Sequence, residues 1–110
     1  MQEVDKVVDT TIDKTAESVQ ERIREAVDYI NEETGENEHH IIEFDYTVKD
    51  PKSPKYNQKT KRRGEPYEIR GDSVWVYDLN SGGIRRFKLQ GISKLEITDE
   101  KYEPQFDIKI

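Results

Sequence analysis

The first third of the chain has the spacing of apolar residues that is typical of an amphipathic helix. From Val4 to Ile30 there is no Gly or Pro, and apolar residues recur at alternating intervals of four and three. This spacing places them along one side of an α-helix, and they are Ile12, Ala16, Val19, Ile23, Ala26 and Ile30. Asn and Gly within residues 31–35 supply the helix terminator. The sequence therefore predicts one long N-terminal helix within residues 1–35.

After residue 39 the spacing changes to the alternation of a half-buried strand. One side of this strand carries His40, Ile42, Phe44, Tyr46 and Val48, and the other side is polar. Further short strands are predicted over residues 67–70, 74–79, 84–89, 94–98 and 106–110, with turn residues between most of them. Strands of this length favour a small antiparallel barrel or bent sheet over residues 36–110. The predicted fold class is therefore α+β.

The predicted helix is long for so small a protein. From Val4 to Ile30 it would span about 40 Å, which exceeds the width of a β domain of about 70 residues. Its N-terminal half would then expose apolar side chains to water. The sequence therefore predicts a homo-oligomer that associates through this helix.

Residues 49–64 stand out by their charge. They contain seven basic residues, one acidic residue and two Pro, without apolar periodicity, so we expect a basic hairpin loop exposed to solvent. Cations around an aromatic residue, here Tyr56, are typical of segments that follow a phosphate backbone. The alternatives are a merely solvated loop and a loop that docks on an acidic partner, including the helix of a second copy. The candidate nucleic-acid-binding residues are Lys55, Lys59, Lys61, Arg62, Arg63 and Arg86.

Composition limits the classes of function that remain. The net charge of −6 is unevenly spread, because residues 1–48 carry 14 acidic and 4 basic side chains. Such a segment would repel polyanions unless it faces away from them. Without cysteine there is no disulfide framework or thiolate metal site. No apolar run is long enough to cross a membrane, and the N-terminus does not resemble a signal peptide, so we expect a cytoplasmic protein without a membrane partner.

Catalytic motifs are missing from the sequence. It contains no cysteine nucleophile, no Ser in a nucleophile elbow and no glycine pattern that would cradle a phosphate. His39 and His40 are adjacent, so in a strand they point to opposite faces and cannot share a metal ion without further ligands. We therefore expect a protein that is not an enzyme and needs no metal or cofactor.

Arg85 is a candidate ligand-binding residue because strand alternation places it on the same face as Phe87 and Leu89. A guanidinium group on an apolar face needs an anion, a carbonyl group or water. The partner is either a bound anionic ligand or an internal carboxylate, for which Glu68 and Asp78 are the candidates.

Trp75 and Tyr77 also share one strand face. Their rings either cover the core or form a platform on which a ligand stacks. Together with Arg85 and Tyr46, they complete the set of candidate ligand-binding residues.

The order of motifs in the second half of the chain resembles the WYL domain family. The resemblance spans roughly residues 20–105 and rests on Ile42, Phe44, Tyr46, Pro66, Tyr77, Arg85, Phe87, Leu89, Ile92, Tyr102 and Pro104. It implies an Sm-like β barrel that senses nucleic acid or nucleotide-like ligands in bacterial regulators, with Arg85 at the position of the family's ligand-contacting arginine. The residues that name the family are replaced by Asp72, Ser73 and Val74, and no helix-turn-helix precedes the domain.

Two functions follow from these observations as hypotheses. The first is a stand-alone regulatory module that binds nucleic acid or a nucleotide-like anion through Arg85 and the basic loop. The second is a protein-interaction module, of phage or mobile-element origin, that acts on a host protein through its charged surfaces. They differ in their dependence on charge, because binding to nucleic acid would require the basic loop and binding to a basic protein would require the acidic helix.

Overall fold

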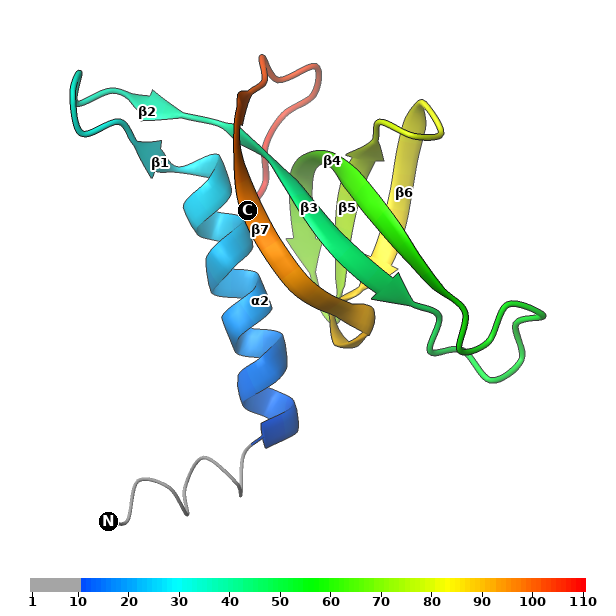
Figure 1. Ribbon diagram of the computed structural model, residues 1–110. Helices are drawn as coiled ribbons and strands as arrows, with labels where there is room; N and C mark the ends of the chain where they lie inside the picture. Colours follow the sequence, from blue (N-terminus) through cyan, green and yellow to red (C-terminus); the bar gives the residue numbers. More distant parts are fainter. Residues whose placement is uncertain (1–10) are drawn as a thin grey trace, which may run out of the picture.

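The computed structural model describes the backbone of residues 11–110 and the side chains from residue 17 onward. Within residues 11–110, one helix precedes a small two-stranded sheet and a larger five-stranded antiparallel sheet (Figure 1). In chain order the elements are α2 (Thr11–Val27), β1 (Tyr29–Ile30), β2 (Asn37–Glu38), β3 (His40–Thr47), β4 (Lys59–Arg70), β5 (Ser73–Asp78), β6 (Gly83–Lys88), the 3-10 helix η1 (Leu89–Gly91) and β7 (Ile92–Lys101). No helix in this described part has the length and apolar character needed to cross a membrane.

Helix α2 ends earlier than its apolar stripe predicts. The helix stops at Val27, whose carbonyl oxygen lies 2.7 Å from Nδ1 of His39. Tyr29 and Ile30 form β1, which pairs with β2. Their backbone groups therefore belong to a sheet and do not continue the helix. The prediction of a long helix reaching Ile30 is therefore wrong. Its first residues and the side chains of Ile12 and Ala16 lie outside the described part.

The larger sheet has the strand order β6-β5-β4-β3-β7, and all its neighbouring strands are antiparallel. The two outermost strands, β6 and β7, do not pair with each other, so the sheet is open and the prediction of an Sm-like barrel is wrong. The physical reason lies in the core, where Val19, Ile23 and Ala26 of α2 are buried together with the inner-face residues of the sheet. Figure 1 shows α2 beside β7 and β3. The helix covers the inner face along β7 and β3, so the inner-face residues are buried without closure of the sheet.

The register of the sheet separates an inner face, which packs on α2, from an outer face. Ile42 and Phe44 of β3 belong to the inner core together with Val74 and Val76 of β5. Residues between them on each strand point outward because strand side chains alternate. A second, smaller core on the outer face consists of Ile41, Tyr67 and Tyr102, with Tyr77 and Ile108 packed against it.

The basic segment and the C-terminus also differ from the sequence expectation. Strand β4 begins at Lys59, so residues 59–64 of the expected loop are paired with β3. The expected last strand over residues 106–110 is reduced to one bridge between Glu68 and Lys109. The connection between β3 and β4 is therefore the shorter segment 48–58, named the basic loop below.

Candidate nucleic-acid interface

The basic loop has a defined conformation that its own residues stabilise. Asp50 accepts hydrogen bonds from the backbone N–H groups of Lys52 and Ser53, through its carboxylate and its carbonyl oxygen respectively, at 3.0 Å each. At the base of the loop, the Asn57 N–H donates a hydrogen bond to the Val48 carbonyl at 2.9 Å, and the Val48 N–H donates one to the Gln58 carbonyl at 3.1 Å. Asp50, the only acidic residue of the loop, thus stabilises the loop backbone.

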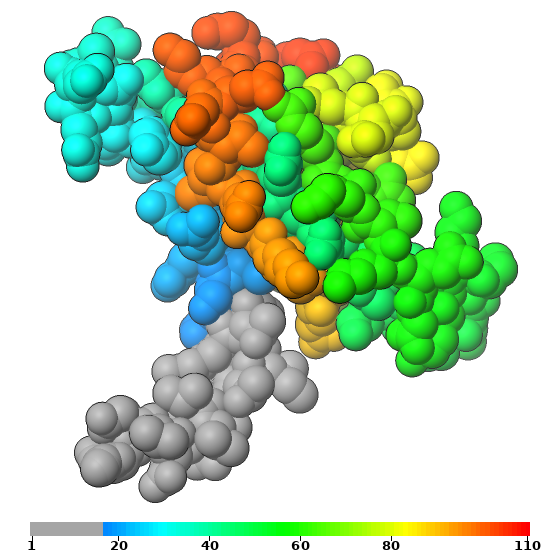
Figure 2. All heavy atoms as spheres, viewed as in Figure 1, coloured from blue at the N-terminus to red at the C-terminus, as the bar shows by residue number. Residues whose placement is uncertain are grey.

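The lysines of this loop are exposed and carry uncompensated charge. Among the described side chains, no carboxylate forms an ion pair with Lys49, Lys52 or Lys55. The ring of Tyr56 beside them is 46% exposed. Figure 2 shows the loop as a lobe that projects from one end of the molecule (green). An ordered, protruding set of cations around a tyrosine suits contact with a phosphate backbone.

Strand β4 continues the row of cations from the loop along the outer face. Lys61 and Arg63 pair in register with Asp45 and Glu43 of β3, so their side chains point away from α2. The ammonium group of Lys61 lies 3.7 Å from Asp45, as that of Lys59 does at 3.8 Å. These neighbouring carboxylates weaken the positive field of the strand relative to that of the loop.

Arg63 and Arg62 are more firmly held than the lysines. Arg63 forms an ion pair with Glu43 at 3.2 Å and another with Glu100. Arg62 points to the inner face and lies 5.6 Å from the ring centroid of Phe87. Together with Lys61 and Asn80, these side chains line a concavity of about 280 Å³ beyond the end of β5.

Asp78 determines the position of Arg85. The Asp78 side chain is 1% exposed, and its Oδ2 lies 3.0 Å from Nη1 of Arg62 and 3.5 Å from Nε of Arg85. Arg85 also donates a hydrogen bond to Ser81 at 3.0 Å. The internal ion pair that the sequence left open is therefore present, and Asp78 rather than Glu68 is the partner. Arg85 nevertheless remains half exposed at the rim of the inner face.

Tyr46 belongs to the inner core. Its hydroxyl group accepts a hydrogen bond from the backbone N–H of Lys88 at 3.1 Å. Its ring packs edge-on against Phe87 with a centroid distance of 4.8 Å. These contacts join β3 to the end of β6, so in this structure Tyr46 connects strands of the sheet.

Trp75 and Tyr77 lie on the outer face, because Val74 and Val76 beside them are buried under α2. The guanidinium group of Arg70 lies 4.6 Å from the Trp75 ring centroid. Arg86 is the partner of Trp75 on β6 and is exposed. The structure thus separates the predicted ligand-binding residues, with Trp75 and Tyr77 on the outer face and Tyr46 in the inner core.

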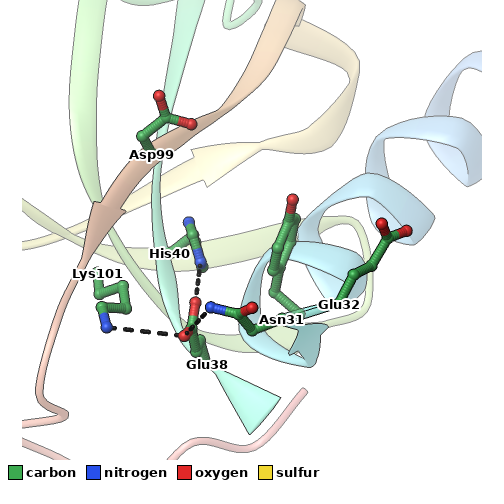
Figure 3. Close-up of a pocket in the computed structure, with 7 residues that line it drawn as sticks. Asn31, Glu32, Glu38, His40, Asp99 and Lys101 are labelled. Carbon is green, nitrogen blue, oxygen red and sulfur yellow. Dashed lines mark hydrogen bonds and ion pairs between the residues drawn. The ribbon is translucent and has the colours of Figure 1, made fainter. Parts of the chain in front are cut away.

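A second concavity, of about 420 Å³, lies between the β1–β2 hairpin and β7 (Figure 3). At its base the carboxylate of Glu38 contacts His40 at 2.9 Å, Asn31 at 2.9 Å and Lys101 at 3.6 Å. The other ring nitrogen of His40 lies 2.7 Å from the Thr98 carbonyl oxygen. The hydrogen bond from Asn31, followed by that from His40, lowers the pKa of Glu38 below its ordinary value.

This Glu38 network has the character of a structural connection rather than of a reaction centre. Both carboxylate oxygens of Glu38 and both ring nitrogens of His40 already have partners within the protein. No group of three or more His, Asp or Glu side chains that could hold a metal ion occurs among the described residues. The network joins the hairpin to the sheet through β7.

Three residues at these sites were not found from the sequence. Phe106 reaches the outer face through the packing of the distant C-terminal segment on Tyr67 and Tyr77. Arg70 lies at the turn between β4 and β5, and this hairpin brings it to Trp75. Glu38 lies two positions before His40, and this same-side spacing on an extended chain was the one available signal.

Neither a scan against protein-family models nor a search of curated proteins finds a match to this chain. The function must therefore be argued from the geometry of the chain itself.

Proposed function

We propose that this protein is a non-enzymatic module that binds nucleic acid, and that the basic loop holds the phosphate backbone. The observation that carries this proposal is the exposure of Lys49, Lys52 and Lys55 on an ordered loop. The one acidic residue of this loop, Asp50, is hydrogen-bonded to the loop backbone. Ordering before binding lowers the entropic cost of association. Cations without internal partners release counterions from the nucleic acid when they bind it.

The acidic net charge of the chain does not oppose this function, because the acidic groups are concentrated elsewhere. The β1–β2 hairpin and the loop that joins its strands carry four glutamates and no basic residue over residues 29–38. Figure 1 shows this hairpin and the basic loop at opposite ends of a molecule whose extents are 43 × 40 × 21 Å. Charges separated by much more than about 8 Å are screened at physiological salt. The loop therefore presents a local positive field.

A pair of matched double variants tests this role. Lys52→Ala with Lys55→Ala removes two loop cations, and Lys94→Ala with Lys109→Ala removes two exposed lysines outside the loop, so both proteins have the same net charge. Binding to a labelled oligonucleotide is measured by fluorescence anisotropy at several salt concentrations. We expect the loop variant to bind more weakly and to lose about two units of salt slope, because each phosphate contact contributes about one.

The control variant should keep the affinity and the salt slope of the unmodified protein. Equal losses in the two variants would show that only net charge matters. Such a result, or the absence of measurable binding by the unmodified protein, would refute the proposal.

A protein-interaction function is the second candidate, and one observation favours it. Ile30 on the β1–β2 hairpin is 54% exposed and lies among the glutamates of residues 32–38. An exposed apolar residue within an acidic rim suits a basic protein partner. Capture of one defined partner that survives nuclease treatment and is lost in Ile30→Asp would support this function over the first.

A further inference from the structure

We propose that the outer face around Trp75, Tyr77 and Phe106 is a stacking platform for unpaired bases, so that the ligand is single-stranded nucleic acid. This inference rests on the proposed function and specifies its ligand. It assigns the bases to the aromatic platform and the phosphates to the basic loop.

Trp75 is the centre of the platform. Trp75 lies on β5, and its ring is on the outer face. It pairs with Glu68 of β4 on one side and with Arg86 of β6 on the other. Arg70 places its guanidinium group 4.6 Å from the ring centroid. Bases stack both on aromatic rings and on the planes of arginine guanidinium groups. A base can therefore replace the Arg70 guanidinium group on the Trp75 ring or stack on its outer side. The exposed Arg86 beside them supplies a cation for the phosphate of the same nucleotide.

Tyr77 and Phe106 extend the platform along β5 toward the C-terminal segment. Their ring centroids are 6.5 Å apart, and Phe106 also packs edge-on against Tyr67 at 5.2 Å. Phe106 is nevertheless 49% exposed, and Ile84, the partner of Tyr77 on β6, is 45% exposed. Phe106 and Ile84 thus remain about half exposed on one face, beside the partly buried rings of Trp75 and Tyr77.

Packing alone does not account for this exposure. The outer core accounts for the position of Tyr77, which packs against it, but Phe106 and Ile84 remain about half exposed. Large apolar side chains that remain exposed on one face are typical of a binding site. Aromatic rings flanked by arginines fit a base and its phosphate better than they fit an apolar protein surface.

The register of β4 places both parts of the proposed site on one face. Lys61 and Arg63 point outward near its start, and the register shift between Pro66 and Glu68 brings Glu68 into register with Trp75. Arg70 at the end of the strand then reaches the Trp75 ring. A single-stranded nucleic acid bound along β4 would contact the basic loop at the start of β4 and the platform at its end. Duplex bases are already stacked on one another and would not use such a platform.

The single Trp of the chain makes a direct test available. A base stacked on Trp75 should quench its fluorescence. The probes are an oligothymidylate of about 15 nucleotides, an abasic strand with the same number of phosphates, and a duplex of the same length. We expect quenching only with the oligothymidylate, and about tenfold weaker binding of the abasic strand.

Variants complete the test. Phe106→Ala should weaken oligothymidylate binding about tenfold while leaving the abasic strand unaffected, and Arg86→Gln should weaken both. Tyr29→Ala, which alters a partly exposed aromatic residue at the hairpin end, should change neither. Thermal melts verify that each variant is folded.

The outcomes separate this inference from the proposed function. Equal binding of the oligothymidylate and the abasic strand, without quenching, would refute the platform and leave the role of the loop intact. If none of the probes binds, the proposed function itself is wrong.

Discussion

The carboxylate of Asp78 and the guanidinium group of Arg62 form a direct ion pair of 3.0 Å at the end of the inner face. Asp78 is fully buried, and its second oxygen accepts a hydrogen bond from the backbone N–H of Asn80. Arg85 approaches the same carboxylate from the solvent side at 3.5 Å. One buried anion therefore connects β4, β5 and β6 and the turn between β5 and β6.

The unequal burial of the two arginines predicts unequal effects on stability. Arg62→Ala should lower the free energy of unfolding by about 2 kcal/mol, because a hydrogen bond to a buried charged group is lost. Arg85→Ala should cost less than about 1 kcal/mol, since Arg85 is half exposed and water can replace it. Chemical denaturation measures both values. A larger loss for Arg85→Ala would show that Arg85, and not Arg62, compensates the charge of Asp78.

The Glu38 network predicts a loss of stability in acid. Hydrogen bonds from Asn31 and His40 lower the pKa of Glu38 in the folded protein, so the folded state favours the carboxylate. Its contribution is present above the ordinary glutamate pKa of 4.5 and is lost as the pH falls through the lowered value. Melting temperatures of the unmodified protein and of Glu38→Gln should therefore converge as the pH falls below 4.5. Glu36→Gln, in the exposed hairpin loop, is the control and should melt in parallel with the unmodified protein.

The outer core predicts a second loss of stability, in alkali. Burial raises the pKa of Tyr67 to about 12, and burial also raises the pKa of Tyr102. Both phenols are therefore favoured in their protonated form in the folded state. Their contribution is present below the ordinary tyrosine pKa of about 10 and is lost as the pH rises toward 12.

Tyr67→Phe should make the melting temperature less sensitive to pH above 10. It should also lower stability at pH 7, because the Tyr67 hydroxyl group donates to Glu65 at 2.7 Å and accepts from the Gln105 N–H at 2.9 Å. Tyr56→Phe, in the exposed basic loop, is the matched control. An unchanged alkaline profile in Tyr67→Phe would contradict the assignment.

Two glycines provide a prediction about close packing in the sheet. A Cβ atom at Gly64 would collide with the carbonyl oxygen of Tyr77 on β5, whereas one at Gly83 would meet nothing within 4 Å. Gly64→Ala should therefore lower the free energy of unfolding by about 1–3 kcal/mol, and Gly83→Ala should change it by less than about 0.5 kcal/mol. Denaturant titration of the two variants compares them directly. Similar values would mean that β4 and β5 can separate without cost.

The sequence determined which residues share a face, but not where the elements end. Val19, Ile23 and Ala26 follow the helical stripe and are buried together, because helical periodicity is a local property. Ile30 continues the same stripe, yet it pairs with Asn37 in a strand. That pairing needs a turn and a second strand, and tertiary contacts then override local helix preference.

The basic segment shows the same division. Composition located the charged connection, but the start of β4 at Lys59 was missed because Thr60 and Arg62 occupy its inner-face positions. Alternation is visible in a sequence only when one face is apolar, and these residues lie at the polar end of the sheet.

Arg85 illustrates what only the tertiary structure decided. The sequence required an anion for a cation on an apolar face and left Glu68, Asp78 or a ligand as candidates. The antiparallel pairing of β5 with β6 brings Asp78 next to Gly83 and so within reach of Arg85. Whether the sheet closes was decided in the same way. A barrel and an open sheet have the same strand pattern, and only the tertiary pairing, which leaves β6 and β7 apart, separates them.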